Sequence, residues 1–267
     1  MFFFINRQDR SGSILQLMFY AYSYCFHNNI HFDGIISNNV WWYNNNFFSY
    51  VDKYFKIKNK VISINNMKKI NFDQIKNYSN LDSSNFYTEF DVSKLCPYFS
   101  TNINKFFDYN FKKHIHDNNN DIFNCLNKTR TIISIHIRRG DVNANIQRRY
   151  TYDSVYLNVI DYIIEHYNLV NYEIHLFSEI NFNGNLSLYN KYKILKLHLA
   201  KNNDIQEIML DFMHMINSDF FVCSKSSFSY LPALLNKNGI VFHNNKFWNK
   251  PLEHFRIYND DNGDILT

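Results

Sequence analysis

The second half of this chain alternates short apolar runs with longer amphipathic stretches, and this alternation constrains the fold more than any other feature. Apolar runs typical of strands lie at residues 131–137, 173–177, 194–199, 220–223 and 239–243. Apolar residues at helical spacing occur between them, at residues 153–167, 204–216 and 227–236. Strands that alternate with helices usually form parallel sheets. The pattern therefore predicts an α/β fold with a Rossmann-like sheet.

The first half is less regular. The expected elements are a strand at residues 2–5, a helix at 13–26 and a strand at 54–64. The polar stretch from residue 66 to 127 is expected to be irregular, with a loop or linker at residues 117–121. A chain of 267 residues can hold two small domains. We expect an N-terminal domain over residues 1–128 and a C-terminal domain over residues 129–267.

Composition excludes several classes of protein. Aromatic residues make up 18% of the chain, far from the composition of disordered proteins. The net charge of +4 suits a small anionic ligand, but it is too dispersed to indicate nucleic acid. The apolar run at residues 2–5 is too short for a signal peptide, and no run is long enough to span a membrane. We therefore expect a soluble, cytoplasmic or otherwise intracellular protein.

A group of charged residues follows the first apolar run directly. Residues 131–142 read TIISIHIRRGDV, which places His136, Arg138, Arg139 and Asp141 at the end of a predicted buried strand. In an open α/β sheet, ligands bind beyond the carboxyl ends of the strands. Arginine suits phosphate because its guanidinium stays charged and donates two parallel hydrogen bonds. The pattern favours an anion site, and the alternative is a pair of surface salt bridges around the turn.

A second group follows the apolar run at residues 220–223. Ser226 and Ser227 lie where a helix is expected to begin, and helix N-termini favour phosphate through free N–H groups and a positive dipole end. The alternative is that one serine simply caps the helix, a role compatible with the first. Asp211 falls within an apolar helical stretch, where it either faces solvent or accepts hydrogen bonds from a ligand such as guanine.

The sequence does not indicate a metal site. The four cysteines lack CxxC spacing, which argues against a zinc site or a redox motif, and no Asp-x-Asp occurs. Residues 259–264, NDDNGD, resemble a fragment of a calcium loop without its closing Glu. We expect this segment to be a frayed terminus.

Together, these motifs resemble those of the inverting fucosyltransferases of the α1,2, α1,6 and protein O-fucosyltransferase superfamily, with the best match to the α1,2 type. That family carries HxRRGD, an FSDD-like motif, and a D-L-x-x-M helix that leads to a strand and S-[ST]-F-S. The corresponding segments of this chain, in the same order, are residues 136–141, 177–180, 211–215 and 226–229. The family's glycine-rich turn and Q-[LM]-[FM]-x-Y-A segment correspond to residues 11–21, which keep QLMFYA but only one glycine, Gly12.

The resemblance implies a GT-B-like α/β fold, with two Rossmann-like halves and the donor site in the cleft. It also implies a glycosyltransferase that moves L-fucose from GDP-fucose to a glycan acceptor with inversion. GDP-fucose is then a substrate, and no cofactor or metal is expected. Arg138 and Asp141 are the implied catalytic residues. The implied donor-binding residues are His136, Arg138, Arg139, Ser178, Asp211, Ser226, Ser227 and Phe228.

Each of the main residues has an implied role. Arg138 binds the β-phosphate and stabilises charge on the departing GDP. Arg139 supports it, by phosphate contact or by bracing the motif. The turn at residues 226–227 holds the diphosphate, while His136 and Asp211 hold ribose and guanine.

The general base is harder to assign, because residues 142–152 contain no carboxylate. Asp141, Asp153 and Asp9 are candidates, although pairing with the arginines explains Asp141 better.

Three alternatives stay open at this point. The first is a transferase of the same fold that uses another nucleotide sugar. The second is a catalytically silent relative that binds a nucleotide sugar or a glycan, which the reduced glycine turn and missing base favour. The third is an unrelated phosphate-binding α/β protein, which the ordered set of motifs disfavours.

Overall fold

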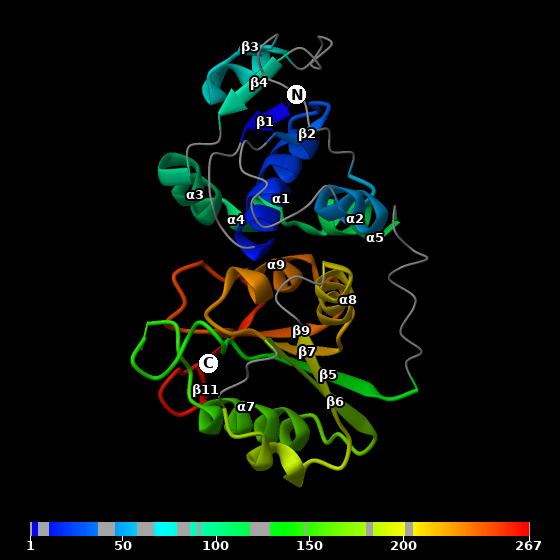
Figure 1. Ribbon diagram of the computed structural model, residues 1–267, viewed down its shortest axis with the longest axis vertical. Coiled ribbons are helices and arrows are strands. Elements are labelled where there is room, and N and C mark those ends of the chain that lie inside the picture. The colour runs from blue at the N-terminus through cyan, green and yellow to red at the C-terminus, as the bar shows by residue number, and fades with distance from the viewer. Residues whose placement is uncertain are drawn as a thin grey trace. The chain divides into compact units, whose positions relative to one another are not determined.

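A computed structural model of the protein describes residues 2–4, 11–36, 46–57, 67–78, 86–89, 92–117, 129–146, 148–179, 184–200 and 205–266. The chain divides into two compact units, Met1–Asn120 and Asp121–Thr267 (Figure 1). No helix within the described ranges is both long and apolar enough to cross a membrane.

The first unit contains a four-stranded parallel sheet in the order β2-β1-β4-β3. Its strands are β1 (Phe2–Phe4), β2 (Gly34–Ile36), β3 (Lys68–Lys69) and β4 (Phe86–Glu89). Its helices are α1 (Ser11–His27), α2 (Asn46–Phe55), η2 (Phe72–Tyr78), α3 (Val92–Thr101), α4 (Ile103–Phe106) and α5 (Tyr109–Asp117).

Helix α1 is the centre of this unit and packs mainly through aromatic rings. Tyr20 stacks on Phe99 with ring centroids 4.8 Å apart, and Phe19 meets Phe55 edge to face at 4.9 Å. The first contact joins α1 to α3 and the second joins it to α2. The expectation of irregular structure is wrong for residues 92–117, which form α3, α4 and α5. Residue 117 of the expected linker at 117–121 belongs to α5, and the rest of that linker lies outside the described residues. The strand expected at residues 54–64 is also wrong at its start, because α2 reaches Phe55, and its remainder from residue 58 lies outside the described residues.

The second unit contains a seven-stranded sheet in the order β11-β10-β9-β8-β5-β6-β7. Six strands are parallel, and β11 alone runs antiparallel to its neighbour. The bounds are β5 (Thr131–His136), β6 (Tyr172–Glu179), β7 (Leu195–Ala200), β8 (Phe220–Val222), β9 (Ile240–Asn244), β10 (Arg256–Tyr258) and β11 (Ile265–Leu266). Numbered from β5, the parallel strands follow the Rossmann order 3-2-1-4-5-6, whose topological switch point lies between β5 and β8.

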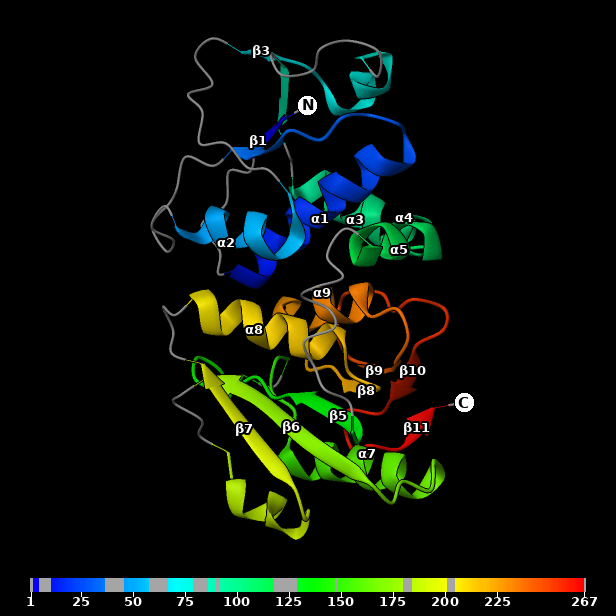
Figure 2. The ribbon, with the colours of Figure 1, turned by 90° about the vertical axis from the view of Figure 1, so that its right-hand side faces the viewer.

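Helices cover both faces of this sheet. Figure 2 shows α7 (Asp153–His166) on one face, with α8 (Ile205–Ile216) and α9 (Ser227–Leu235) on the other. The short helix η4 (Leu186–Lys191) precedes β7. Alternate residues of β5, among them Ile133 and Ile135, pack against Val159 and Ile163 of α7 in a dry core. The intervening residues Ser134 and His136 therefore face α8 and α9.

The elements predicted in this half of the chain are confirmed, but its last residues differ from the expectation. Residues 259–264 are not a frayed terminus: they connect β10 to β11, and Asp260 is buried there. The two strands at Arg256–Tyr258 and Ile265–Leu266 were not predicted, because they are too short to show a pattern.

Candidate functional site

The two sequence motifs meet at the switch point of the second sheet. His136 ends β5, and the segment that links β8 to α9 contains Ser224 and Ser226. The Nδ1 atom of His136 lies 2.6 Å from the Ser224 hydroxyl, and Arg138 Nη1 lies 3.5 Å from the Ser226 hydroxyl. Residues 88 positions apart thus lie side by side at the carboxyl ends of β5 and β8, which is where open α/β sheets bind ligands.

Arg138 is the partly exposed arginine of this site. Its Nη2 atom donates to Asp141 Oδ2 at 2.9 Å, and its side chain is 16% exposed. The pairing interpretation of Asp141 therefore holds in this structure, because the carboxylate lies on the guanidinium. The opposite nitrogen, Nη1, is directed at Ser226. A guanidinium in this position can offer its N–H groups to an anion at the start of α9.

Arg139 faces a different environment and is fully buried. Its Nη2 atom donates to Asp153 Oδ1 at 2.8 Å and to the Thr151 carbonyl at 3.0 Å. Its guanidinium also covers the ring of Tyr150, with 4.2 Å from the guanidinium carbon to the ring centroid. Of the two roles expected for Arg139, this geometry is that of a brace for the loop after β5. The expectation of surface salt bridges does not describe it.

Ser226 and its neighbours form the start of α9. Ser226 is the N-cap, and its hydroxyl accepts from the Phe228 N–H at 3.2 Å. Ser227 is the first residue of the helix and is partly exposed. The Phe228 ring packs on His136, with centroids 5.1 Å apart, and edge-on against Phe212 of α8 at 4.5 Å. The aromatic contacts fix the helix start against the end of β5.

His136 is neutral at ordinary pH. Burial, together with the nearby charge of Arg138, lowers the pKa of this histidine to about 3. A neutral imidazole has one donor and one acceptor nitrogen. His136 therefore brings hydrogen bonding but no charge to the site.

Ser178 and Gly140 show how the loop after β5 is held. The Ser178 hydroxyl donates to the Ile137 carbonyl at 2.7 Å, so this side chain supports the backbone of the motif. Gly140 has φ of +80°, and a Cβ placed there would lie 2.1 Å from Glu179 Oε2. Only glycine combines this backbone conformation with the close approach of Glu179.

Asp211 lies on the buried side of α8. It is 6% exposed, so the solvent-facing interpretation is wrong. Its Oδ1 atom is 3.7 Å from His198 Nδ1 on β7. Burial, together with the Glu207 carboxylate, raises the pKa of Asp211 to about 8. In this environment the carboxyl group holds its proton at neutral pH.

The three candidate bases have different positions. Asp141 is paired with Arg138, and Asp153 accepts from Arg139, from Tyr189 OH at 3.2 Å and from the Asn185 N–H at 3.1 Å. Both carboxylates are therefore engaged in holding loops. Asp9 lies outside the described residues. Gly12 lies inside α1, so at this position the chain forms a helix and not a glycine turn.

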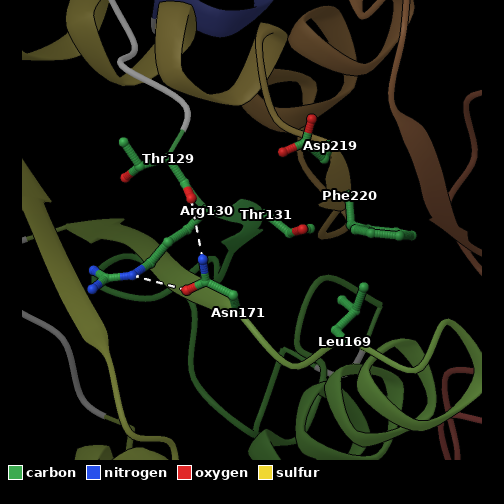
Figure 3. A pocket seen from close by; sticks show the side chains of 7 residues that line it. All are labelled: Thr129, Arg130, Thr131, Leu169, Asn171, Asp219 and Phe220. Carbon is green, nitrogen blue, oxygen red and sulfur yellow. Dashed lines mark hydrogen bonds between the residues drawn. The ribbon is translucent and has the colours of Figure 1, made fainter.

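No group of three or more His, Cys, Asp or Glu side chains suited to a metal occurs among the residues that the structure describes. An open hollow lies at the amino ends of the strands of this sheet and is lined by Thr129, Arg130, Thr131, Leu169, Asn171, Asp219 and Phe220 (Figure 3). Its polar groups already have partners: Arg130 donates to Asn171 Oδ1 at 3.1 Å, and Asp219 Oδ2 accepts from the Ile132 N–H at 2.9 Å. This amino edge of the strands is also not where such sheets bind ligands.

Comparison with known proteins finds similarity at the level of structure. No protein-family model matches the sequence, and no curated protein matches it. The heptosyltransferase WaaC of E. coli, solved with ADP, is 9% identical with a TM-score of 0.52, over 99% of this chain and 95% of WaaC. The E. coli ADP-heptose lps heptosyltransferase II is 8% identical with a TM-score of 0.50, over 96% of this chain and 90% of that protein. The fucosyltransferase NodZ from Bradyrhizobium is 12% identical with a TM-score of 0.46, over 91% and 94%.

Identities this low show the fold alone. The chain has an α/β fold of the GT-B-like kind, with parallel Rossmann-like sheets, as do the two heptosyltransferases. The predicted fold class is confirmed.

Proposed function

We propose that this chain is a glycosyltransferase that uses a nucleoside diphosphate sugar as its donor. The observation that carries the proposal is the meeting of Arg138 and Ser226 at the switch point of a sheet in Rossmann order. There, the Arg138 guanidinium lies beside the N-terminus of α9, and both groups bind phosphate favourably. The fold shared with two sugar-nucleotide transferases supports this proposal.

In the proposed reaction, an acceptor hydroxyl attacks the anomeric carbon of the donor sugar from the side opposite the diphosphate. Negative charge builds on the leaving diphosphate as the bond breaks. Arg138 and the N–H groups at the start of α9 stabilise that charge, which is commonly the largest contribution to such catalysis. In-line displacement inverts the anomeric configuration, and the proton of the acceptor hydroxyl passes to water or to the departing diphosphate. Arg139, buried on Asp153, keeps the loop in place.

For the donor we propose GDP-fucose and for the acceptor a glycan hydroxyl, with α1,2 linkage as the first choice. The support is the order and spacing of the motifs at residues 136–141, 177–180, 211–215 and 226–229. The same geometry at the diphosphate would serve a transferase with another nucleotide sugar. A catalytically silent relative is the second candidate, because Asp141 and Asp153 are both engaged in ion pairs.

The test is donor turnover with a panel of GDP-, ADP- and UDP-sugars, together with calorimetric titration of GDP, ADP and UDP. Release of GDP from GDP-fucose above the uncatalysed rate is the expected result. Binding of a nucleotide diphosphate without turnover of any sugar would favour the silent relative. Absence of both binding and turnover would refute the proposal.

A further inference from the structure

A buried ion pair lies behind the start of α9. Lys225 stands between Ser224, which contacts His136, and Ser226, which contacts Arg138. Its side chain points inward and is 1% exposed, and its Nζ atom lies 2.5 Å from Asp260 Oδ2. Asp260 belongs to the segment that connects β10 and β11. Lys225, which lies between Ser224 and Ser226, is thus paired with a residue that follows β10, near the β11 edge of the sheet.

The second oxygen of Asp260 joins two further loops. Its Oδ1 atom accepts from the Thr151 hydroxyl at 2.6 Å and from Asn244 Nδ2 at 2.7 Å. Thr151 lies between β5 and α7, and Asn244 ends β9. The Thr151 carbonyl in turn accepts from Arg139 at 3.0 Å. One carboxylate therefore connects the loops that follow β5, β8 and β9.

The free-energy cost of a buried, unpaired charge keeps the contacts of Asp260 fixed. A buried carboxylate is tolerated only when it is paired and when its other lone pairs accept hydrogen bonds. Asp260 meets both conditions, with Lys225 on one oxygen and two polar donors on the other. Displacement of any one loop would leave a charge or a donor without its partner in a dry environment. The loops after β5 and β8, which carry Arg138 and Ser226, are therefore held in one relative position.

We infer that Asp260 is a positioning residue for the diphosphate site. This inference rests on the proposed function, and it assigns a role in nucleotide binding to the segment after β10. By turning Lys225 inward and fixing Thr151, Asp260 sets the distance between the guanidinium of Arg138 and the start of α9. The ligand class is a nucleoside diphosphate, free or as the leaving part of a sugar donor.

The test compares Asp260→Asn with Asp261→Asn in the full chain. Asp261 is a matched control, because it also pairs with a lysine, Lys246, but at the exposed surface. We expect Asp260→Asn to weaken GDP or ADP binding by about tenfold or more, since small displacements at such sites have large effects. Asp261→Asn should bind as the wild type does.

A second variant separates positioning from stability. Asp260→Asn also leaves the Lys225 ammonium buried without its partner and should lower the melting temperature. The double variant Lys225→Met/Asp260→Asn removes that charge, so it should recover stability but keep the weak nucleotide binding. If the double variant recovers both, Asp260 only neutralises Lys225 and the inference is wrong. If the wild type binds no nucleoside diphosphate, the proposed function itself fails, whereas unchanged binding by Asp260→Asn overturns only this inference.

Discussion

At the scale of single residues, the two adjacent arginines of one motif have different surroundings and different roles. Arg138 keeps part of its guanidinium toward Ser226, while Arg139 is fully buried on Asp153 and Thr151. The division follows from the position of the two residues after β5, where successive side chains point to opposite sides. One arginine is available to a ligand and the other stabilises the loop that presents it.

Substitution of Arg138 should therefore lower the turnover rate, whereas substitution of Arg139 should lower the stability of the fold. Arg138→Lys keeps the charge but loses the bidentate fork, so we expect the turnover rate to fall by about 10²–10³ with the melting temperature unchanged. Arg139→Met should instead destabilise the fold by about 3 kcal/mol or more, because it leaves the Asp153 carboxylate with an unpaired charge. Turnover assays and urea denaturation check both, with exposed Arg148→Met as the control. Near-full activity of Arg138→Lys would contradict its assigned role.

Asp211 gives a prediction about pH. If its carboxyl group accepts hydrogen bonds from guanine, it must lose its proton first, and burial raises its pKa to about 8. GDP affinity should therefore increase with pH between 6 and 8, by up to about tenfold per unit. Asp211→Asn should remove this pH dependence and reduce the preference for GDP over UDP and ADP. Titration calorimetry at pH 6, 7 and 8 measures both effects, and equal affinity for GDP and UDP in the wild type would show that Asp211 does not select guanine.

At the scale of elements, the two faces of the second sheet differ in chemistry. The α7 face is lined by aliphatic and aromatic side chains, whereas the α8 face contains a stack of histidines from β6, β7 and α8. His175 Nδ1 lies 2.9 Å from His198 Nε2, and His175 Nε2 lies 2.9 Å from Glu173 Oε1. Burial lowers the pKa of His198 to about 3 and that of His214 to about 4. These rings are packed as neutral groups.

The histidine stack should make the fold sensitive to acid. Because the pKa of His198 is lower in the folded than in the unfolded chain, its stabilising contribution is complete above pH 6.5 and is lost as the pH falls toward 3. At pH 5 this loss is about 2 kcal/mol. Asp211, with its raised pKa, changes in the opposite direction, so the informative quantity is a difference between variants.

Urea denaturation at pH 7 and pH 5 measures that difference. Between these values, the wild type should lose about 2 kcal/mol more than His198→Asn. The exposed His31→Asn is the control and should follow the wild type. An equal loss in the wild type and in His198→Asn would mean that the stack is not the source of the acid sensitivity.

The sequence predicted the elements of the second unit well, because its strands are apolar runs separated by helical spacing. It failed for the helices within residues 92–117, where aromatic contacts such as Tyr20 with Phe99 join residues that are distant in the chain. Within the site, the motifs were visible, but the contact of Thr151 with Asp260 across 109 positions was not. Lys225 resembled any other basic residue of a loop, since nothing local shows that its partner follows β10.

At the scale of the whole molecule, each unit has its own sheet, and the second unit brings Arg138 to the start of α9. The positive groups of its site are Arg138 and a helix start, and Asp141 lies on that arginine. We therefore propose that a divalent metal is not needed. Excess EDTA should leave donor turnover unchanged, and added Mn²⁺ should not increase it. Complete loss in EDTA that Mn²⁺ restores would instead assign the phosphates to a metal.

The central position of β5 also has a consequence for how the second unit folds. β5 precedes the other strands of its sheet in the chain, yet its second neighbour is β8, and Ser134 and Ser218 meet across 84 positions with 2.6 Å between their hydroxyls. Strand pairing across such long sequence separations is slow. Until β8 pairs, one edge of the apolar strand β5 stays open and can aggregate with other chains. A partly folded chain that lacks β8 would expose this edge. The same step that covers it brings Arg138 and Ser226 together at the proposed diphosphate site, so if the proposed function is correct, recovery of nucleotide binding during refolding should report the closure of the sheet.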